Sequence, residues 1–227
     1  GDRRHSDETV VEDFVGALVR TLGRGGVVLI PAFAVDRTEV VLRLLRESTD
    51  AGRVPEVPIY VDSPMALAAL RVYRRAIEES WPELKPELHA QLDALIPERL
   101  VEVREVAESR ELTQRGGPAI MISASGMATG GRVLHHLASR LPDARNTVIL
   151  VGYQAEGTRG RSLLEGARAL KLLGRYIPVR SEVVDLSALS VHADSEELIA
   201  WVASAPRAPE VTFVVHGEPR ASAALRD

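Results

Sequence analysis

Short apolar runs alternate along the chain with longer stretches in which apolar residues recur at helical spacing. The continuous apolar runs predict buried strands at residues 26–32, 57–61, 118–123, 147–152 and 211–215. Apolar residues three and four positions apart predict helices at 7–23, 36–47, 64–79, 107–114, 132–140 and 194–205. Residues 100–105 alternate and are typical of an edge strand, and strand-like runs follow Arg175. This order predicts an α/β protein with a largely parallel sheet flanked by helices.

Parallel sheets bind ligands beyond the carboxyl ends of their strands, and one such end is rich in small residues. After the predicted strand 118–123, Ser125, Gly126, Gly130 and Gly131 precede a helix that begins near Arg132. Unpaired backbone N–H groups and the helix dipole make such a loop a natural anion site. The alternative is that the glycines only permit a tight turn, because the lysine and the hydroxyl residue of a P-loop are missing.

Charge is distributed unevenly along the chain. The net charge is −4, but residues 126–180 contain nine Lys or Arg against three acidic residues. A basic segment inside an acidic chain indicates a local site for a polyanion. For any single arginine, a solvated helix face remains the alternative.

The chain contains no cysteine, which excludes disulfides, cysteine nucleophiles and cysteine-ligated zinc. Any metal must therefore be held by histidines and carboxylates. The apolar runs are too short to cross a bilayer, and the first eight residues are polar. We therefore expect a cytoplasmic protein without a membrane partner. Because the chain starts with Gly1 and stops abruptly, we also expect a fragment of a longer protein.

Two histidines lie where α/β enzymes often place reactive groups. His192 directly precedes a predicted helix, and His216 ends the predicted strand 211–215. Imidazole at a strand end can bind a metal or act as a general acid or base, and Ser190 could donate to a phosphate. A packed or surface role is the alternative for each histidine.

Other polar residues have blander interpretations. The adjacent His135 and His136 are interpreted as surface or packing residues, and Asp62 and Asp194 as helix caps. No His-x-His-x-Asp-His or His-Glu-x-x-His motif occurs.

The order of seven motifs resembles a known family. They are GDRRH at 1–5, IPAFAVDRTEVVL at 30–42, PIYVDSPMA at 58–66, ISASGMATGGR at 122–132, VGYQAEGTRGRSL at 151–163, SVHADSEEL at 190–198 and VVHGEP at 214–219. In this order the chain resembles the β-CASP nucleases of the metallo-β-lactamase superfamily. The likeness is closer to the RNA 3′-end cleavage-factor branch than to ribonuclease J.

The resemblance implies a division into two parts. Residues 1–178 would form the β-CASP domain, and 179–227 would be the returning C-terminal segment of a metallo-β-lactamase domain whose N-terminal part is absent. It also implies that RNA binds in the cleft between the two domains. The residues expected to contact RNA or phosphate are Ser123, Ser125, Gly126, Met127, Gly130, Gly131, Arg132, Arg159, Arg161 and Arg37.

The resemblance further implies a zinc-dependent ribonuclease in which metal-bound hydroxide attacks the phosphodiester. His192 and Ser190 would act at the scissile phosphate, and His216 would bind one of two zinc ions. The other metal ligands would lie upstream of Gly1, so we expect this chain alone to be inactive and not to hold the zinc pair. Two alternatives are a non-catalytic RNA-binding or dimerisation module and a DNA-directed nuclease. Homodimer formation, the specific substrate, and endo- or exonucleolytic cleavage stay open.

Overall fold

The computed structural model describes residues 7–84, 96–189, 192–215 and 217–226. Six strands form one parallel sheet in the order β3-β2-β4-β1-β5-β8. Their bounds are β1 Val27–Pro31, β2 Ile59–Asp62, β3 Leu100–Glu102, β4 Ala119–Ser123, β5 Thr147–Leu150 and β8 Glu182–Asp185. The predicted α/β fold with a largely parallel sheet is confirmed, and β3 is an edge strand as predicted.

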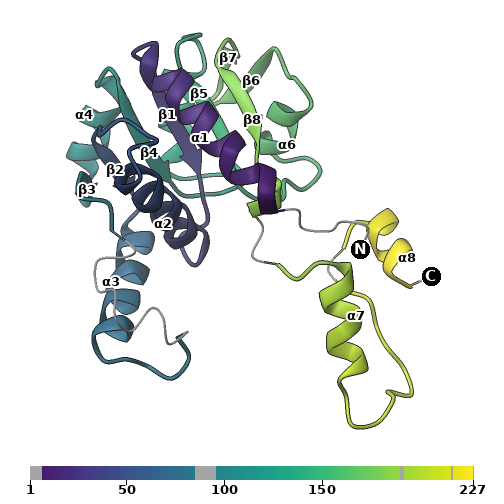
Figure 1. Ribbon diagram of the computed structural model, residues 1–227. Coiled ribbons are helices and arrows are strands. Elements are labelled where there is room, and N and C mark those ends of the chain that lie inside the picture. The colour runs from purple at the N-terminus through teal and green to yellow at the C-terminus, as the bar shows by residue number, and fades with distance from the viewer. Residues whose placement is uncertain (1–6, 85–95, 190–191, 216, 227) are drawn as a thin grey trace.

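Helices cover both faces of this sheet (Figure 1). On one face lie α1 (Asp7–Gly23), α2 (Arg37–Asp50) and α3 (Pro64–Glu78), and on the other lie α4 (Val106–Gln114), α5 (Val133–Arg140) and α6 (Arg159–Leu164). Successive strand residues point to opposite layers: in β4, Ile120 and Ile122 join the first core, whereas Met121 joins the second. Because both faces are covered, the strands appear as continuous apolar runs in the sequence.

A two-stranded antiparallel hairpin, β6 (Ala169–Leu172) and β7 (Arg175–Pro178), follows α6. The two residues between its strands, Leu173 and Gly174, have positive φ values of 48° and 80°, as a type I′ turn requires. Sequence patterning indicated the strand at Arg175 but not its partner β6.

The C-terminal part comprises a 3₁₀ turn (Ser187–Leu189) and the helices α7 (Ser195–Ala203) and α8 (Pro219–Arg226). Neither helix buries a residue, and both lie away from the sheet (Figure 1). Asp194 caps α7 as predicted: it accepts from the Glu197 N–H at 2.9 Å, and the Glu197 carboxylate accepts from the Asp194 N–H.

The predicted strand at residues 211–215 is wrong, because these residues form no strand and are exposed. A strand needs hydrogen-bonding neighbours, and no strand of the described chain pairs with this segment. Among the described helices, none has both the length and the apolar character needed to cross a bilayer.

Candidate functional site

The carboxyl ends of the three central strands are joined at Ser123. Ser123 lies opposite Pro31 of β1 and Asp62 of β2. Its carbonyl accepts from the Ala32 N–H at 3.1 Å, and its buried hydroxyl donates to the Asp62 carbonyl at 3.0 Å. The hydroxyl predicted to contact phosphate is therefore engaged inside the sheet edge.

The small-residue loop between β4 and α5 is tightly folded against the chain that follows β1. A Cβ atom on Gly126 would lie 2.8 Å from the Phe33 ring and 3.0 Å from the Phe33 backbone nitrogen. The Ser125 hydroxyl oxygen accepts from the Thr129 N–H at 3.2 Å, and Gly131 has a φ of 81°. Glycine at 126 and 131 is thus needed for the loop conformation.

A buried carboxylate anchors the end of this loop. Asp62 has no exposed surface; its Oδ1 accepts from Arg132 Nη1 at 2.7 Å, and its Oδ2 accepts from Ser109 Oγ and His136 Nε2, both at 2.6 Å. Burial alone would raise the pKa of Asp62, but the hydrogen bonds from His136, Ser109 and Arg132 outweigh it and hold the pKa below its usual value. The group ties β2 to α4 and α5.

The prediction that Asp62 caps α3 is therefore wrong. Ser63 is the cap, and its hydroxyl accepts from the Ala66 N–H at 3.2 Å. Of the two interpretations of His136, surface or packing residue, packing is correct, because the side chain is fully buried. The ring also donates a hydrogen bond to Asp62. Sequence reasoning missed this role because nothing close in the chain marks it.

The loop after β5 lies directly against the small-residue loop. The Gly160 N–H donates to the Met127 carbonyl at 3.2 Å, and Gln154 Nε2 donates to the Gly126 carbonyl at 3.1 Å. Arg159 Nη1 donates to the Thr129 carbonyl at 3.1 Å. The structure thus brings Arg159 to the small-residue loop that contains Met127.

The remaining arginines predicted to bind phosphate differ in their exposure to solvent and in the partners of their guanidinium groups. Arg132 also donates to the Arg104 carbonyl at 2.9 Å, and its side chain is 21% exposed. Arg161 forms an ion pair with Glu165 at 2.7 Å. Arg37 is only 3% exposed, so its guanidinium reaches a ligand only if the first turn of α2 rearranges.

That first turn of α2 contains two buried ionisable groups with few partners. Arg37 Nε and Nη1 and both carboxylate oxygens of Glu39 make no hydrogen bond of good geometry within the described chain, although the backbone at Glu39 and Asp36 partly stabilises the Glu39 carboxylate. Burial lowers the pKa of Arg37 and raises the pKa of Glu39 to about 7. The arginine packs beside Gly152, where a Cβ atom would lie 3.8 Å from Arg37 Nε.

The C-terminal motifs are partly placed. Glu218, two residues after His216, accepts a hydrogen bond from the Tyr153 hydroxyl and one at 3.3 Å from the Glu156 N–H. This contact brings the C-terminal segment to the loop after β5. His192 is exposed just before α7. Ser190 and His216 lie outside the described residues, and the residues that are described contain no group of three His, Asp or Glu able to hold a metal.

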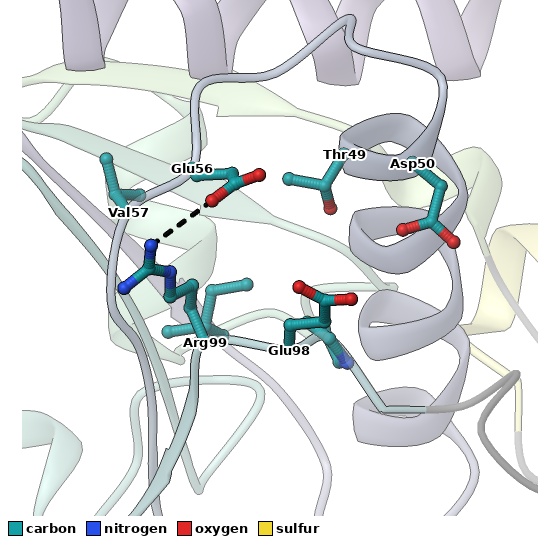
Figure 2. Close-up of a pocket in the computed structure, with 8 residues that line it drawn as sticks. Thr49, Asp50, Glu56, Val57, Glu98 and Arg99 are labelled. Carbon is teal, nitrogen blue, oxygen red and sulfur yellow. Dashed lines mark hydrogen bonds and ion pairs between the residues drawn. The ribbon is translucent and has the colours of Figure 1, made fainter.

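A cavity of about 160 Å³ lies at the opposite end of the sheet, at the amino ends of β2 and β3 (Figure 2). Two of its three carboxylates have a basic partner: Glu56 pairs with Arg99 at 3.3 Å, as Figure 2 shows, and Asp50 pairs with Arg46 at 2.7 Å. None of the site residues predicted from the sequence lines it. The loops at the carboxyl edge are therefore the better candidate.

Two family models match this chain, one after the other. A family model described as the Beta-Casp domain matches residues 38–163, and one described as the Zn-dependent metallo-hydrolase RNA specificity domain matches 176–227. The first match includes the small-residue loop and the loop after β5, and the second includes Glu218, which contacts the loop after β5.

Several curated proteins are similar over 96% of this chain. Ribonuclease TTHA0252 of Thermus thermophilus is 37% identical over 219 residues, and the RNase J-like protein of Methanocaldococcus jannaschii is 33% identical over 217. Transcription termination factor FttA of Pyrococcus horikoshii is 34% identical over 229 residues. The chain spans 49% of the first two relatives and 34% of the third.

Proposed function

We propose, because this chain belongs to the β-CASP family, that it is the RNA-clamping part of an RNA-processing, metal-dependent ribonuclease. The observation that carries the proposal is the meeting of two small-residue loops, 124–132 and 151–158, at the carboxyl edge of the sheet. Backbone N–H groups at such loops bind phosphate without reading sequence. The relatives named ribonucleases and the RNA specificity description support RNA as the ligand.

The division of the chain belongs to the same proposal. Residues 1–178 form the β-CASP domain, and 179–227 are the segment that returns to a catalytic domain whose other part lies in the remaining half of the protein; this segment first adds β8 to the edge of the sheet. Support comes from the exposure of both C-terminal helices and from the share of the relatives that the chain spans. An apolar segment without a core of its own packs on another part of the molecule.

The proposed roles follow the edge outward. Ser125, Gly126, Met127, Gly130 and Gly131 present backbone to the phosphates, with Ser123 beneath them. Arg132, Arg159 and Arg161 hold the RNA electrostatically, and Arg37 contributes from below the surface. His192 and Ser190 position the scissile phosphate and handle its protons.

Zinc is the metal that the family description implies. The described residues do not assemble a zinc site, so we propose that His216 contributes one ligand to a pair of ions held mainly by the other half of the protein. When bound, such ions activate water for attack on a phosphodiester. This chain alone is not expected to hold the pair.

The test uses the full-length protein and one sequence offered as labelled RNA and as DNA. Replacing His192 by alanine should reduce RNA cleavage by about 100-fold, the usual contribution of a general acid or base, while zinc stays at about two ions per chain. His135→Ala, an exposed histidine on α5, is the matched control and should leave cleavage unchanged.

Three results would count against the proposal. Preferential cleavage of DNA would overturn the substrate, and unchanged RNA cleavage by His192→Ala would overturn the role of that residue. Loss of zinc in His192→Ala would make His192 a metal ligand instead.

A further inference from the structure

The β6–β7 hairpin presents one flat outer face to solvent. Leu170 and Leu172 point inward and are buried in the core shared with α5 and α6. Their neighbours point outward: Lys171 lies directly across from Tyr176, which is 76% exposed. The short type I′ turn makes the hairpin a fixed platform on which an aromatic ring stands beside an ammonium group.

The charge around this face has one sign. Residues 166–181 contain Arg168, Lys171, Arg175 and Arg180, all exposed, and no Asp or Glu. None of the four forms an ion pair with another residue that the structure describes. The acidic residues nearest in sequence have other partners, since Glu165 pairs with Arg161. Two of the four, Lys171 and Arg175, belong to the hairpin: Lys171 shares the outer face with Tyr176, whereas Arg175 lies across from Leu172 on the other face.

One side chain joins this hairpin to the candidate site. Arg159 Nε donates to the Lys171 carbonyl at 3.0 Å, and its Nη1 donates to the Thr129 carbonyl at 3.1 Å. The same guanidinium therefore holds the hairpin and the small-residue loop. An RNA strand bound at the loop can continue to the neighbouring hairpin.

We propose that the outer face of β6–β7 is a second contact for single-stranded RNA, in which a base stacks on Tyr176 and a phosphate lies against Lys171, the residue directly across from it on the same face. The inference rests on the proposed function and extends its binding surface beyond the loops. An exposed aromatic ring beside a cation is a combination that holds unpaired bases, because stacking needs a free base face and the cation neutralises the backbone. The bases of a duplex have no free face for stacking, so a duplex would gain affinity only from the positive charge.

The experiment measures RNA affinity of the full-length protein by fluorescence anisotropy in chelator, which prevents cleavage. Tyr176→Ala should weaken binding of a 20-nucleotide single strand about tenfold, as expected for one lost stacking contact. Tyr176→Phe keeps the aromatic ring, so its affinity for the same RNA should stay within about twofold of the wild-type value. Replacing Lys171 by glutamine should reduce the slope of log affinity against log salt by about 0.7, which is one phosphate contact on a single strand.

The matched control is Arg71→Gln, at an exposed arginine on α3. It removes the same charge and should leave the salt slope unchanged. An equal drop in the control, or unchanged affinity in Tyr176→Ala, overturns the proposal.

A short RNA separates this proposal from the proposed function. The hairpin variants should cleave a six-nucleotide RNA at the wild-type rate, because it occupies only the loops. If the wild-type protein cleaves the short RNA and the hairpin variants bind the long one normally, only the hairpin proposal fails. If the wild-type protein neither binds nor cleaves RNA, both fail.

Discussion

Two buried carboxyl groups at the carboxyl edge of the sheet have opposite environments. Asp62 accepts hydrogen bonds from Ser109, Arg132 and His136, so its charge is stabilised and its pKa is lowered. Glu39 is almost as buried, but no side chain donates to its carboxylate, and burial raises its pKa to about 7 against the smaller lowering by the backbone at Glu39 and Asp36. One carboxylate holds the loop in place, whereas the other costs stability when it ionises.

Glu39 therefore gives a stability dependence on pH with a definite sign. Its folded-state pKa of about 7 lies above the usual 4.5, so between these values the folded state binds more protons than the unfolded state. The stability contributed by this group is highest below pH 4.5 and falls as the pH rises to about 7. Glu39→Gln removes the penalty and should stabilise the protein by roughly 2 kcal/mol more at pH 8 than at pH 5.

Urea unfolding of the wild-type and variant chains at both pH values measures this difference. Glu47→Gln on the same helix is the control, because its carboxylate is half exposed and pairs with Arg43 at the surface. The control should show little pH-dependent gain. A Glu39→Gln gain that is equal at pH 5 and pH 8 would show that the carboxyl group does not titrate in this range.

The role of Asp62 shows why single residues were hard to assign from sequence. The run Asp62-Ser63-Pro64 fits a cap at either of its first two residues, and the nearest partner of the Asp62 carboxylate, Ser109, is 47 positions away. Arg132 and His136 are 70 and 74 positions away. A capping motif is local and can be predicted, as at Asp194, whereas a network of distant side chains appears only in the folded chain.

At the scale of elements, the loop 124–132 contains glycines with different requirements. A Cβ atom on Gly126 meets the Phe33 ring and backbone at 2.8–3.0 Å, whereas one on Gly130 meets nothing within 4 Å. Only Gly131 among the three has a positive φ. The same residue type therefore serves close packing at one position and is replaceable at another.

Alanine at these two positions should separate the effects. Gly126→Ala forces the loop away from Phe33 and should destabilise the chain by about 1–3 kcal/mol, the usual cost of overpacking. Gly130→Ala should be neutral within about 0.5 kcal/mol. Thermal unfolding gives the stabilities, and RNA affinity should fall in the first variant only. Equal stabilities would mean that the loop shifts freely from Phe33.

The elements that sequence patterning predicted well show the apolar periodicity of their burial. The strands of the sheet are covered on both faces, and the helices α1 and α2 bury one face against the sheet, so each matches its predicted position closely. The failures concern context. Strand β6 has only two inward residues, Leu170 and Leu172, and the apolar run 211–215 has no pairing strand in the described chain. An apolar pattern predicts which residues must be buried, but it does not identify the element against which they pack.

At the scale of the molecule, several large apolar side chains that remain exposed lie in the C-terminal part. Trp201 and Ile199 of α7 are 74% and 59% exposed, and Phe213 is 82% exposed. The sheet domain, by contrast, has apolar cores on both of its faces. Exposed apolar groups gathered in one segment indicate a surface that another part of the protein covers.

Trp201→Ala tests this interpretation when its effect on the free energy of unfolding is measured both in this chain and in the full-length protein. In this chain, Trp201→Ala should change the free energy of unfolding by less than about 0.5 kcal/mol, because the ring is exposed. In the full-length protein, where we propose that α7 packs on the catalytic half, the same change should cost about 3 kcal/mol or more. Leu137→Ala is the control, since Leu137 is buried in the sheet domain and should cost the same in both. A Trp201→Ala effect that stays small in the full-length protein would leave the segment uncovered there and contradict the proposed return to the catalytic domain.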